Sequence, residues 1–213
     1  MISFPTQVDR KKRFHQAIAF WIARIISYSI LLILFFILFF ILKRGIGVIN
    51  WEFLTAMPSD GMTKGGILPA IVGTLYLVLM SMVIAFPVGV LSGIYVNEYA
   101  KEGAIKQFVK MMTNNLAGVP SIVFGLFGMA LFVNRLGFGA SILAGSLTLA
   151  LLALPLIIRT TEESLKAVDD TFRHASYALG AGKLRTIRKV VLPIAFPNII
   201  TGLILGIGRV SGE

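Results

Sequence analysis

The amino-acid sequence predicts an all-α protein, a bundle of helices that crosses a membrane several times. Of its 213 residues, 56% are hydrophobic and only 14% are charged, and the mean hydropathy is +0.85. Soluble domains are about 45–50% apolar and about 25% charged. The apolar residues gather in runs of roughly 20, the length that a helix needs to cross a bilayer. A soluble core of this size could not bury so much apolar surface, so we predict a polytopic membrane protein.

Five apolar stretches are predicted to cross the membrane as helices. The first, at residues 17–42, follows basic residues as a signal peptide would. It is too long for a signal peptide and no small-residue cleavage site follows it, so we expect an uncleaved span. The others are predicted at residues 67–96, 116–133, 138–158 and from 190 onward. The last is still apolar where the sequence stops, so we expect a C-terminally truncated chain with about five spans.

Glycine and proline mark the places where these helices are expected to depart from regular geometry. Pro87 lies inside the second predicted helix and is expected to kink it, because proline has no N–H to donate. Gly118 and Pro120 predict an irregular start of the third helix, and Pro193 and Pro197 are expected to break the start of the fifth. Glycines spaced four residues apart allow close helix contact. They occur twice, at Gly89 with Gly93 and at Gly202 with Gly206.

Basic residues predict the orientation in the membrane. The chain has 20 Lys and Arg against 10 Asp and Glu, a net charge of +10. Fourteen of the basic residues lie in the N-terminal segment and after the second and fourth predicted helices, against four in the alternate segments. Because basic loops stay on the cytoplasmic side, we predict a multi-pass protein of the cell (inner) membrane with a cytoplasmic N-terminus. Residues 1–16 would form the cytoplasmic N-terminal segment and residues 17–213 the transmembrane domain.

The composition excludes several kinds of site. The chain has no cysteine, so it can form neither a disulfide nor a zinc–thiolate site. Its two histidines and ten scattered carboxylates show no metal-ligand spacing, so we predict no metal site. The basic run at residues 10–13 has no interleaved aromatic residues, so we predict no nucleic-acid partner. A glycine-rich stretch at residues 180–184 lacks the spacing of a phosphate-cradling loop, so we predict no ATP hydrolysis by this chain. We also predict no catalytic residue and no cofactor.

The segment at residues 159–189 is the longest polar stretch after the first predicted span, and it has an organisation of its own. Thr160 and Glu163 fit a capping box, which predicts a helix that starts there. Residues 169–171 can cap a second short helix, and Gly180 suits its C-terminal end. The sequence therefore predicts a helix–Gly–helix unit between two spans.

Two interpretations of this unit follow from its residues. The second short helix carries its apolar side chains on one face, at Phe172, Ala175 and Leu179. A basic amphipathic segment can lie on anionic lipid headgroups. A short helix with an apolar face can also insert into a groove on a soluble partner. Physical reasoning alone leaves both interpretations open.

The same segment resembles the EAA loop of ABC-importer permeases. The resemblance rests on Ala175, Ser176, Gly180 and the pair Leu192-Pro193. It implies a cytoplasmic coupling helix that seats in a cleft of an ATPase subunit. His174 departs from the motif, which usually has Glu there, while the Ala-Ser and Gly positions remain. The resemblance gives this coupling role to Phe172, His174, Ala175, Ser176, Leu179 and Gly180.

Further strings are similar to phosphate importer permeases of the PstA type. They are GILPA at 66–70, GIYVNEY at 93–99, VPSIVFGLF at 119–127, IRTTE at 158–162 and GRVSGE at 208–213. The resemblance implies the type I, MetI-like permease architecture and a translocation path that is formed with a second permease subunit. It also implies a separate ATP-binding subunit and an extracytoplasmic phosphate-binding protein as partners, with membrane lipid around the spans.

Arg209 is the candidate residue for the anion path. It lies within the fifth predicted span, where an ionisable residue is costly and therefore a functional candidate. Its planar guanidinium can donate two parallel hydrogen bonds to an oxyanion such as phosphate. Glu213 follows one helical turn later and could pair with it, either to moderate the grip on the anion or simply to stabilise packing. Arg159 lies at a predicted membrane boundary, where we expect it to anchor the helix end.

The leading hypothesis is the membrane permease subunit of an ATP-driven phosphate importer. Two alternatives stay open: a permease of the same architecture for another oxyanion such as sulfate, and a passive channel or scaffold without an ATPase. The organised loop at residues 159–189 disfavours the passive protein, and the strings favour phosphate over other anions.

Overall fold

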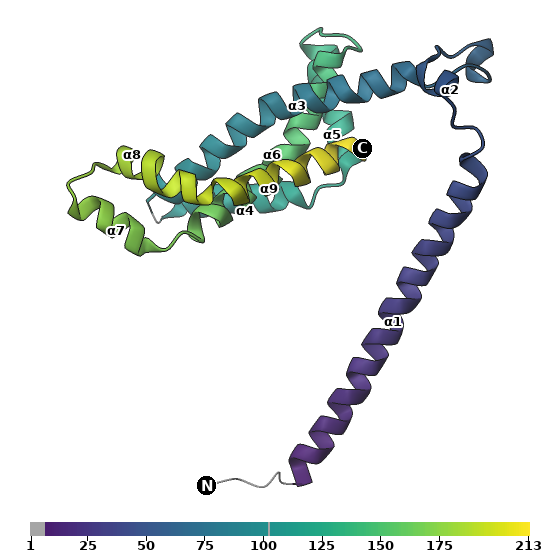
Figure 1. Cartoon of the computed structure of the whole chain (residues 1–213). Coiled ribbons are helices and arrows are strands. Elements are labelled where there is room, and N and C mark those ends of the chain that lie inside the picture. Colours follow the sequence, from purple (N-terminus) through teal and green to yellow (C-terminus); the bar gives the residue numbers. More distant parts are fainter. Residues whose placement is uncertain (1–6, 102) are drawn as a thin grey trace. The chain divides into compact units, whose positions relative to one another are not determined.

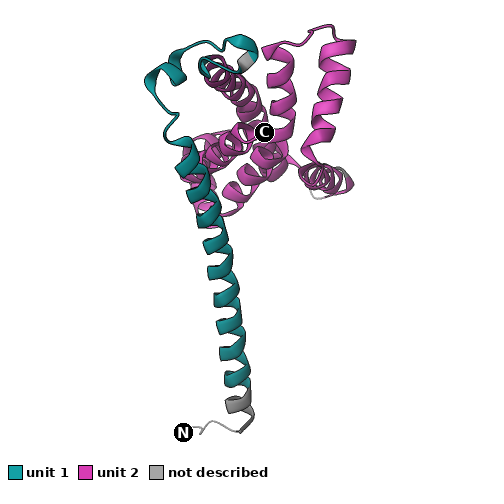
Figure 2. Cartoon of the chain, turned by 90° about the vertical axis from the view of Figure 1, so that its right-hand side faces the viewer, with its two compact units in different colours: residues 1–68 teal, residues 69–213 magenta. Residues whose placement is uncertain are grey.

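The computed structural model describes residues 7–101 and 103–213, and within those ranges it contains helices and no strand (Figure 1). The all-α class is therefore confirmed. Four of the described helices are long and apolar enough to cross a membrane, at Lys12–Gly45, Leu68–Tyr99, Ile142–Lys166 and Lys183–Ser211. A fifth span results if Lys106–Ala117 and Ser121–Arg135, which are bent by 100° at their junction, act as one. The chain divides into two compact units, residues 1–68 and 69–213 (Figure 2).

Unit 1 is dominated by the long helix α1 (Gln7–Gly45), which extends the predicted first span at both ends. None of its apolar window is buried, as expected for a helix whose side chains meet lipid. Two arginines stack on aromatic rings, with the Arg24 guanidinium 5.5 Å from the Trp21 ring centre and that of Arg44 4.6 Å from Phe40. The short helices α2 (Trp51–Thr55) and η1 (Asp60–Met62) follow.

Unit 2 contains the remaining helices. They are α3 (Leu68–Ile94), η2 (Tyr95–Tyr99), α4 (Ala104–Ala117), α5 (Ser121–Gly128), η3 (Met129–Arg135), α6 (Ile142–Lys166), α7 (Asp170–Ala178), α8 (Lys183–Thr186), η4 (Ile187–Val191) and α9 (Leu192–Ser211). One core joins α3, α6 and α9 through Val78, Met82, Ala85, Ala150, Ala153, Ile157 and Val210. A second core joins the end of α6 to η4 and α9 through Leu165, Val168, Val191, Ala195 and Ile199. The spans on either side of α7 are therefore packed on one another.

The predicted helix start at Thr160 is wrong, because α6 runs without interruption through this position to Lys166. The Thr160 hydroxyl donates to the Leu156 carbonyl at 3.0 Å, inside the helix, and does not cap a new one. The buried face of α6 continues through Ile157, Thr161 and Leu165, each at most 1% exposed and four residues apart. Burial of this face stabilises the helix beyond residue 158, although polar residues lie between the buried positions. The span was predicted to end at those polar residues.

The polar residues 97–115 lie between the second and third predicted spans, where no helix was predicted, yet most of them form the amphipathic helix α4. Helix α5 follows after a break at residues 118–120, which confirms the irregular start expected from Gly118 and Pro120. Lys106 and Lys110 lie four residues apart, the spacing that places side chains on one face of a helix. A helix can carry its charged side chains on one face in this way. The polarity of a segment therefore does not by itself predict a loop.

The prolines before the last span do not break it, so that prediction is wrong. The chain is helical from Lys183 to Ser211, and Pro193 and Pro197 both lie within α9. The turn η4 is wound more widely than an α-helix, and the Leu192 N–H bonds the Ile187 carbonyl five residues back. Pro193, which has no N–H to donate, follows directly after this wide turn. The local change of register lets the helix continue.

Gly89 and Gly93 confirm the expected close helix contact. A Cβ added at Gly89 would lie 2.6 Å from Ile157 Cγ2, and one at Gly93 would lie 2.7 Å from Thr161 Cβ, both on α6. These distances are shorter than side-chain contacts allow. The two glycines of α3 therefore let that helix approach α6 closely.

We expect Gly93→Ala to lower the stability of unit 2 by about 1–3 kcal/mol, because the added methyl group overpacks the contact with α6. Gly73→Ala is the matched control, since Gly73 lies on the same helix and a Cβ there meets nothing within 4 Å. Thermal unfolding of the detergent-purified protein measures both. Equal unfolding temperatures for the two variants would contradict the close approach.

Candidate functional site

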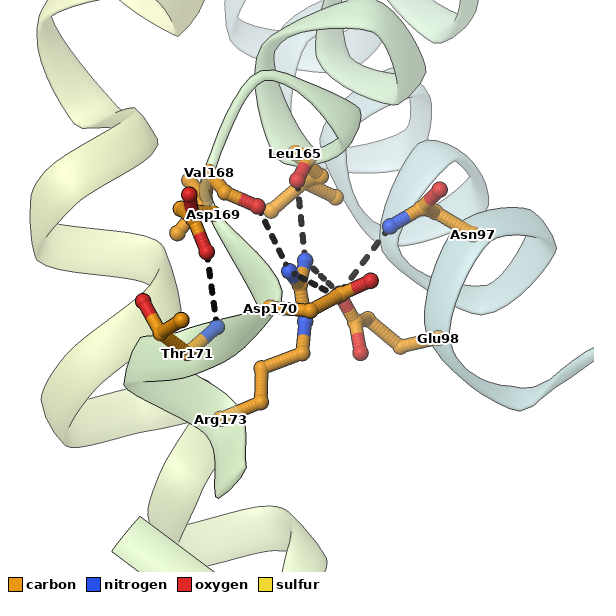
Figure 3. Close-up of polar contacts among 8 residues, drawn as sticks. All are labelled: Asn97, Glu98, Leu165, Val168, Asp169, Asp170, Thr171 and Arg173. Carbon is orange, nitrogen blue, oxygen red and sulfur yellow. Dashed lines mark hydrogen bonds and ion pairs between the residues drawn. The ribbon is translucent and has the colours of Figure 1, made fainter. Parts of the chain in front are cut away.

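The candidate site is the short helix α7 with the residues that anchor it. Asp169 caps its start, where the Thr171 N–H donates to the Asp169 carboxylate at 2.8 Å (Figure 3). This hydrogen bond holds the pKa of Asp169 below its ordinary value. A lowered pKa means that the cap stabilises α7 fully above the ordinary pKa of Asp, and that this contribution is lost as the pH falls through the lowered value.

Arg173 ties α7 to two other elements, as Figure 3 shows. Its Nη2 donates to Glu98 Oε1 and to the Leu165 carbonyl, both at 2.8 Å. Its Nη1 donates to the Val168 carbonyl at 2.8 Å and to Asp170 Oδ1 at 2.9 Å. Burial alone would lower the pKa of Arg173, but the hydrogen bonds and charges of Glu98 and Asp170 more than offset it and hold the pKa above its ordinary value. The guanidinium therefore stays charged and donates to all four acceptors. We call these five residues the Arg173 cluster.

The far end of α7 is fixed by a glycine turn and a hydroxyl pair. Gly180 has a φ of +78°, and its N–H bonds the Tyr177 carbonyl while that of Ala181 bonds the Ser176 carbonyl. This is the Schellman arrangement, so the prediction that Gly180 ends the helix is confirmed. The hydroxyls of Ser176 and Thr186 lie 2.8 Å apart and join α7 to α8.

The outer face of α7 is exposed. Phe172 is 49% exposed and Leu179 88%, and His174 and Ala175 are exposed as well. Ser176 is half-buried because it meets Thr186. The predicted coupling residues thus lie together on α7 and the glycine turn that ends it, and the apolar side chains of Phe172 and Leu179 are exposed.

A second charged cluster lies beside the end of α6. Glu162 is paired with Lys166 at 2.6 Å and with Lys110 of α4 at 3.1 Å, and Arg159 with Glu163 at 3.0 Å. These residues line an open pocket of about 190 Å³. Arg159, the predicted boundary anchor, is therefore exposed and bound to its own helix, and its anchoring role stays a prediction.

Arg209 and Glu213 are not brought together. Arg209 is half-buried in the last turn of α9, whereas Glu213 lies two residues beyond the end of that helix. No ion pair joins the two side chains among the residues that the structure describes. The role of both in an anion path stays a prediction.

Sequence reasoning missed the Arg173 cluster. Glu98 and Arg173 are 75 residues apart, and Arg173 was counted only as one of the basic residues of its segment. Glu98 lies in the GIYVNEY string, which supported the family resemblance but gave the Glu98 carboxylate no role. Only the fold brings the two side chains within hydrogen-bonding distance.

The described helices are those of a multi-pass helical membrane protein, and comparison with known proteins agrees with this fold. Residues 85–213 match the family described as binding-protein-dependent transport system inner membrane components. The chain belongs to this family.

Several curated proteins are similar over most of the chain. The probable ABC transporter permease protein YqgI of Bacillus subtilis (strain 168) is 36% identical over 174 residues, covering 82% of this chain and 59% of that protein. The phosphate transport system permease protein PstA of Mycobacterium leprae (strain TN) is 43% identical over 157 residues, covering 74% and 51%. PstA of Yersinia pestis is 38% identical over 181 residues, covering 84% and 61%. The chain thus spans between half and two thirds of the length of these relatives.

A solved structure confirms the permease architecture. A chain of the MetNI methionine ABC transporter in an inward-facing conformation aligns with a TM-score of 0.55 at 25% identity, covering 69% of this chain and 68% of that one. The predicted type I, MetI-like fold is therefore correct.

Proposed function

We propose that this chain is the membrane permease subunit of an ATP-driven phosphate importer and forms the translocation path with a second permease subunit. The observation that carries the proposal is α7, an anchored short helix with an exposed apolar face between two spans. Relatives that bear the name phosphate transport system permease protein support phosphate as the substrate.

The partners follow from this role. A separate ATP-binding subunit would receive α7 and hydrolyse ATP, so this chain itself would act as a transport subunit and not as an enzyme. An extracytoplasmic binding protein would deliver phosphate to the outer face. The N-terminus would be cytoplasmic, as the distribution of basic residues predicts, and α7 would then face the cytoplasm.

Transport would proceed as a two-state rearrangement of packed helices. ATP binding on the partner would displace α7, and the buried core at Leu165, Val191 and Ile199 would carry this displacement into α6 and α9 together. Because packed cores switch between discrete arrangements and do not deform continuously, a small shift at α7 can change which side of the membrane is open.

Uptake of radiolabelled phosphate by membrane vesicles that contain the assembled transporter tests the proposal. We expect ATP-dependent accumulation of phosphate that excess unlabelled sulfate does not reduce. Accumulation of sulfate in its place would support the alternative of another oxyanion. Equilibration without a requirement for ATP would support a passive channel, and either outcome would contradict the proposal.

A further inference from the structure

We infer that Arg173 is a positioning residue for coupling: the Arg173 cluster locks α7 to the ends of α3 and α6, so that a displacement of α7 moves both spans. The inference rests on the proposed function, because it says how movement of the coupling helix reaches the path. It concerns contacts within this chain, which can be tested apart from the substrate.

The first contact is with α6. The last carbonyls of a helix lack partners within the helix. Arg173 donates to the Leu165 carbonyl in the last turn of α6 and to the Val168 carbonyl two residues beyond that helix, each at 2.8 Å. Leu165 is fully buried, so water does not replace these donors readily. Arg173 therefore caps α6 from the first turns of α7, and the two helices are held at a defined angle.

The second contact is with η2, the wide turn that continues α3. Glu98 Oε1 accepts from Arg173 at 2.8 Å, and the two side chains are only 6% and 13% exposed. Asn97 also donates to Glu98, at 3.0 Å, and restricts its orientation. A largely buried ion pair with further hydrogen bonds loses far more when one partner is removed than an exposed pair does.

Arginine is needed here for its shape as well as its charge. The four acceptors are approached from two nitrogens of one planar group, with two acceptors at each nitrogen. The ammonium group of lysine concentrates its donors at one point and cannot span the same set. Lysine at position 173 would keep the positive charge, but it would not keep the set of hydrogen bonds that positions α7.

The test uses the assembled transporter with three variants, Arg173→Met, Arg173→Lys and Glu98→Ala. Arg135→Met is the matched control, since Arg135 is exposed at the end of η3. ATP hydrolysis and phosphate uptake are measured on the same sample. A spin-label pair at Tyr177→Cys and Leu91→Cys reports the position of α7 relative to α3, because the chain has no cysteine of its own and both sites are exposed.

We expect Arg173→Met and Arg173→Lys to reduce phosphate uptake per ATP hydrolysed by about tenfold, within the usual range for coupling between sites. ATP hydrolysis should persist, and the distribution of spin-label distances should broaden. Glu98→Ala should reduce uptake per ATP less than Arg173→Met does, because it leaves the hydrogen bonds of Arg173 to Leu165, Val168 and Asp170 in place. The double variant Glu98→Ala with Arg173→Met should be no worse than Arg173→Met, because Arg173→Met already removes the contact with Glu98. Arg135→Met should behave as the unaltered protein does.

An unchanged ratio of uptake to ATP hydrolysis with an unchanged distance distribution would overturn the inference. Restoration of both by Arg173→Lys would also overturn it, since charge alone would then suffice. A parallel loss of transporter assembly and uptake with no broadening would reduce Arg173 to an ordinary stabilising residue. Failure of the unaltered protein to take up phosphate would refute the proposed function, whereas the spin-label distances would still test the Arg173 cluster.

Discussion

Replacement of Gly180 by valine is expected to reduce both phosphate uptake and retention of the ATP-binding subunit by about tenfold. Gly180 has a φ of +78°, a conformation that costs an L-residue roughly 1–2 kcal/mol and a β-branched residue more. A Cβ at this position meets nothing within 4 Å, so the effect arises from the backbone and not from crowding. Loss of the turn would change the direction of the chain between α7 and α8 and displace the exposed face of α7.

Two other variants isolate this cause. Gly182→Ala is the matched control, because Gly182 also has open space around it but has an ordinary φ of −73°. We expect it to be tolerated. Gly180→Asn should retain part of the activity, since asparagine adopts the left-handed conformation more readily than valine does. Normal uptake and co-purification of the ATP-binding subunit with Gly180→Val would refute the prediction.

Replacement of Arg209 by alanine is expected to abolish phosphate uptake while membrane insertion and association with the ATP-binding subunit persist. Arg209 lies half-buried in α9, and its planar fork can donate two parallel hydrogen bonds to an oxyanion. Insertion should survive, because removal of an arginine from a span relieves a cost of about 2.5–3.5 kcal/mol. Arg209→Lys should also impair uptake, since lysine keeps the charge but lacks the planar fork.

The matched control for this experiment is Arg24→Ala, which removes an arginine that lies in α1 and stacks on Trp21. We expect its uptake to be near normal. If Arg209→Ala also transports phosphate at a near-normal rate, then Arg209 serves packing only and the anion path has to be sought elsewhere.

Local patterns in the sequence predicted several features that the structure confirms. The length and hydropathy of the apolar runs predicted the all-α membrane fold, because a bilayer demands helices of that length. The break before α5 and the turn at Gly180 were also predictable, since proline and glycine act through the backbone of their own position. Glycines four residues apart marked the close contact of α3 with α6 for a similar reason.

The features that sequence reasoning missed depend on contacts between distant residues. The extension of α6 to Lys166 follows from burial of Thr161 and Leu165, which no local pattern of polarity reveals. The pairing of Arg173 with Glu98 requires the fold to bring α7 to the end of α3.

Site-directed cross-linking measures whether α7 contacts an ATP-binding subunit on the cytoplasmic side of the membrane, as we propose. Leu179→Cys places a single thiol on the most exposed apolar side chain of α7 in a chain without other cysteines. With a photoreactive thiol reagent in the assembled transporter, we expect a covalent product with the ATP-binding subunit. Ser59→Cys, which the distribution of basic residues predicts to lie on the outer side, should give no such product. No product from Leu179→Cys in an intact complex, or equal products from both positions, would contradict a contact between α7 and the ATP-binding subunit.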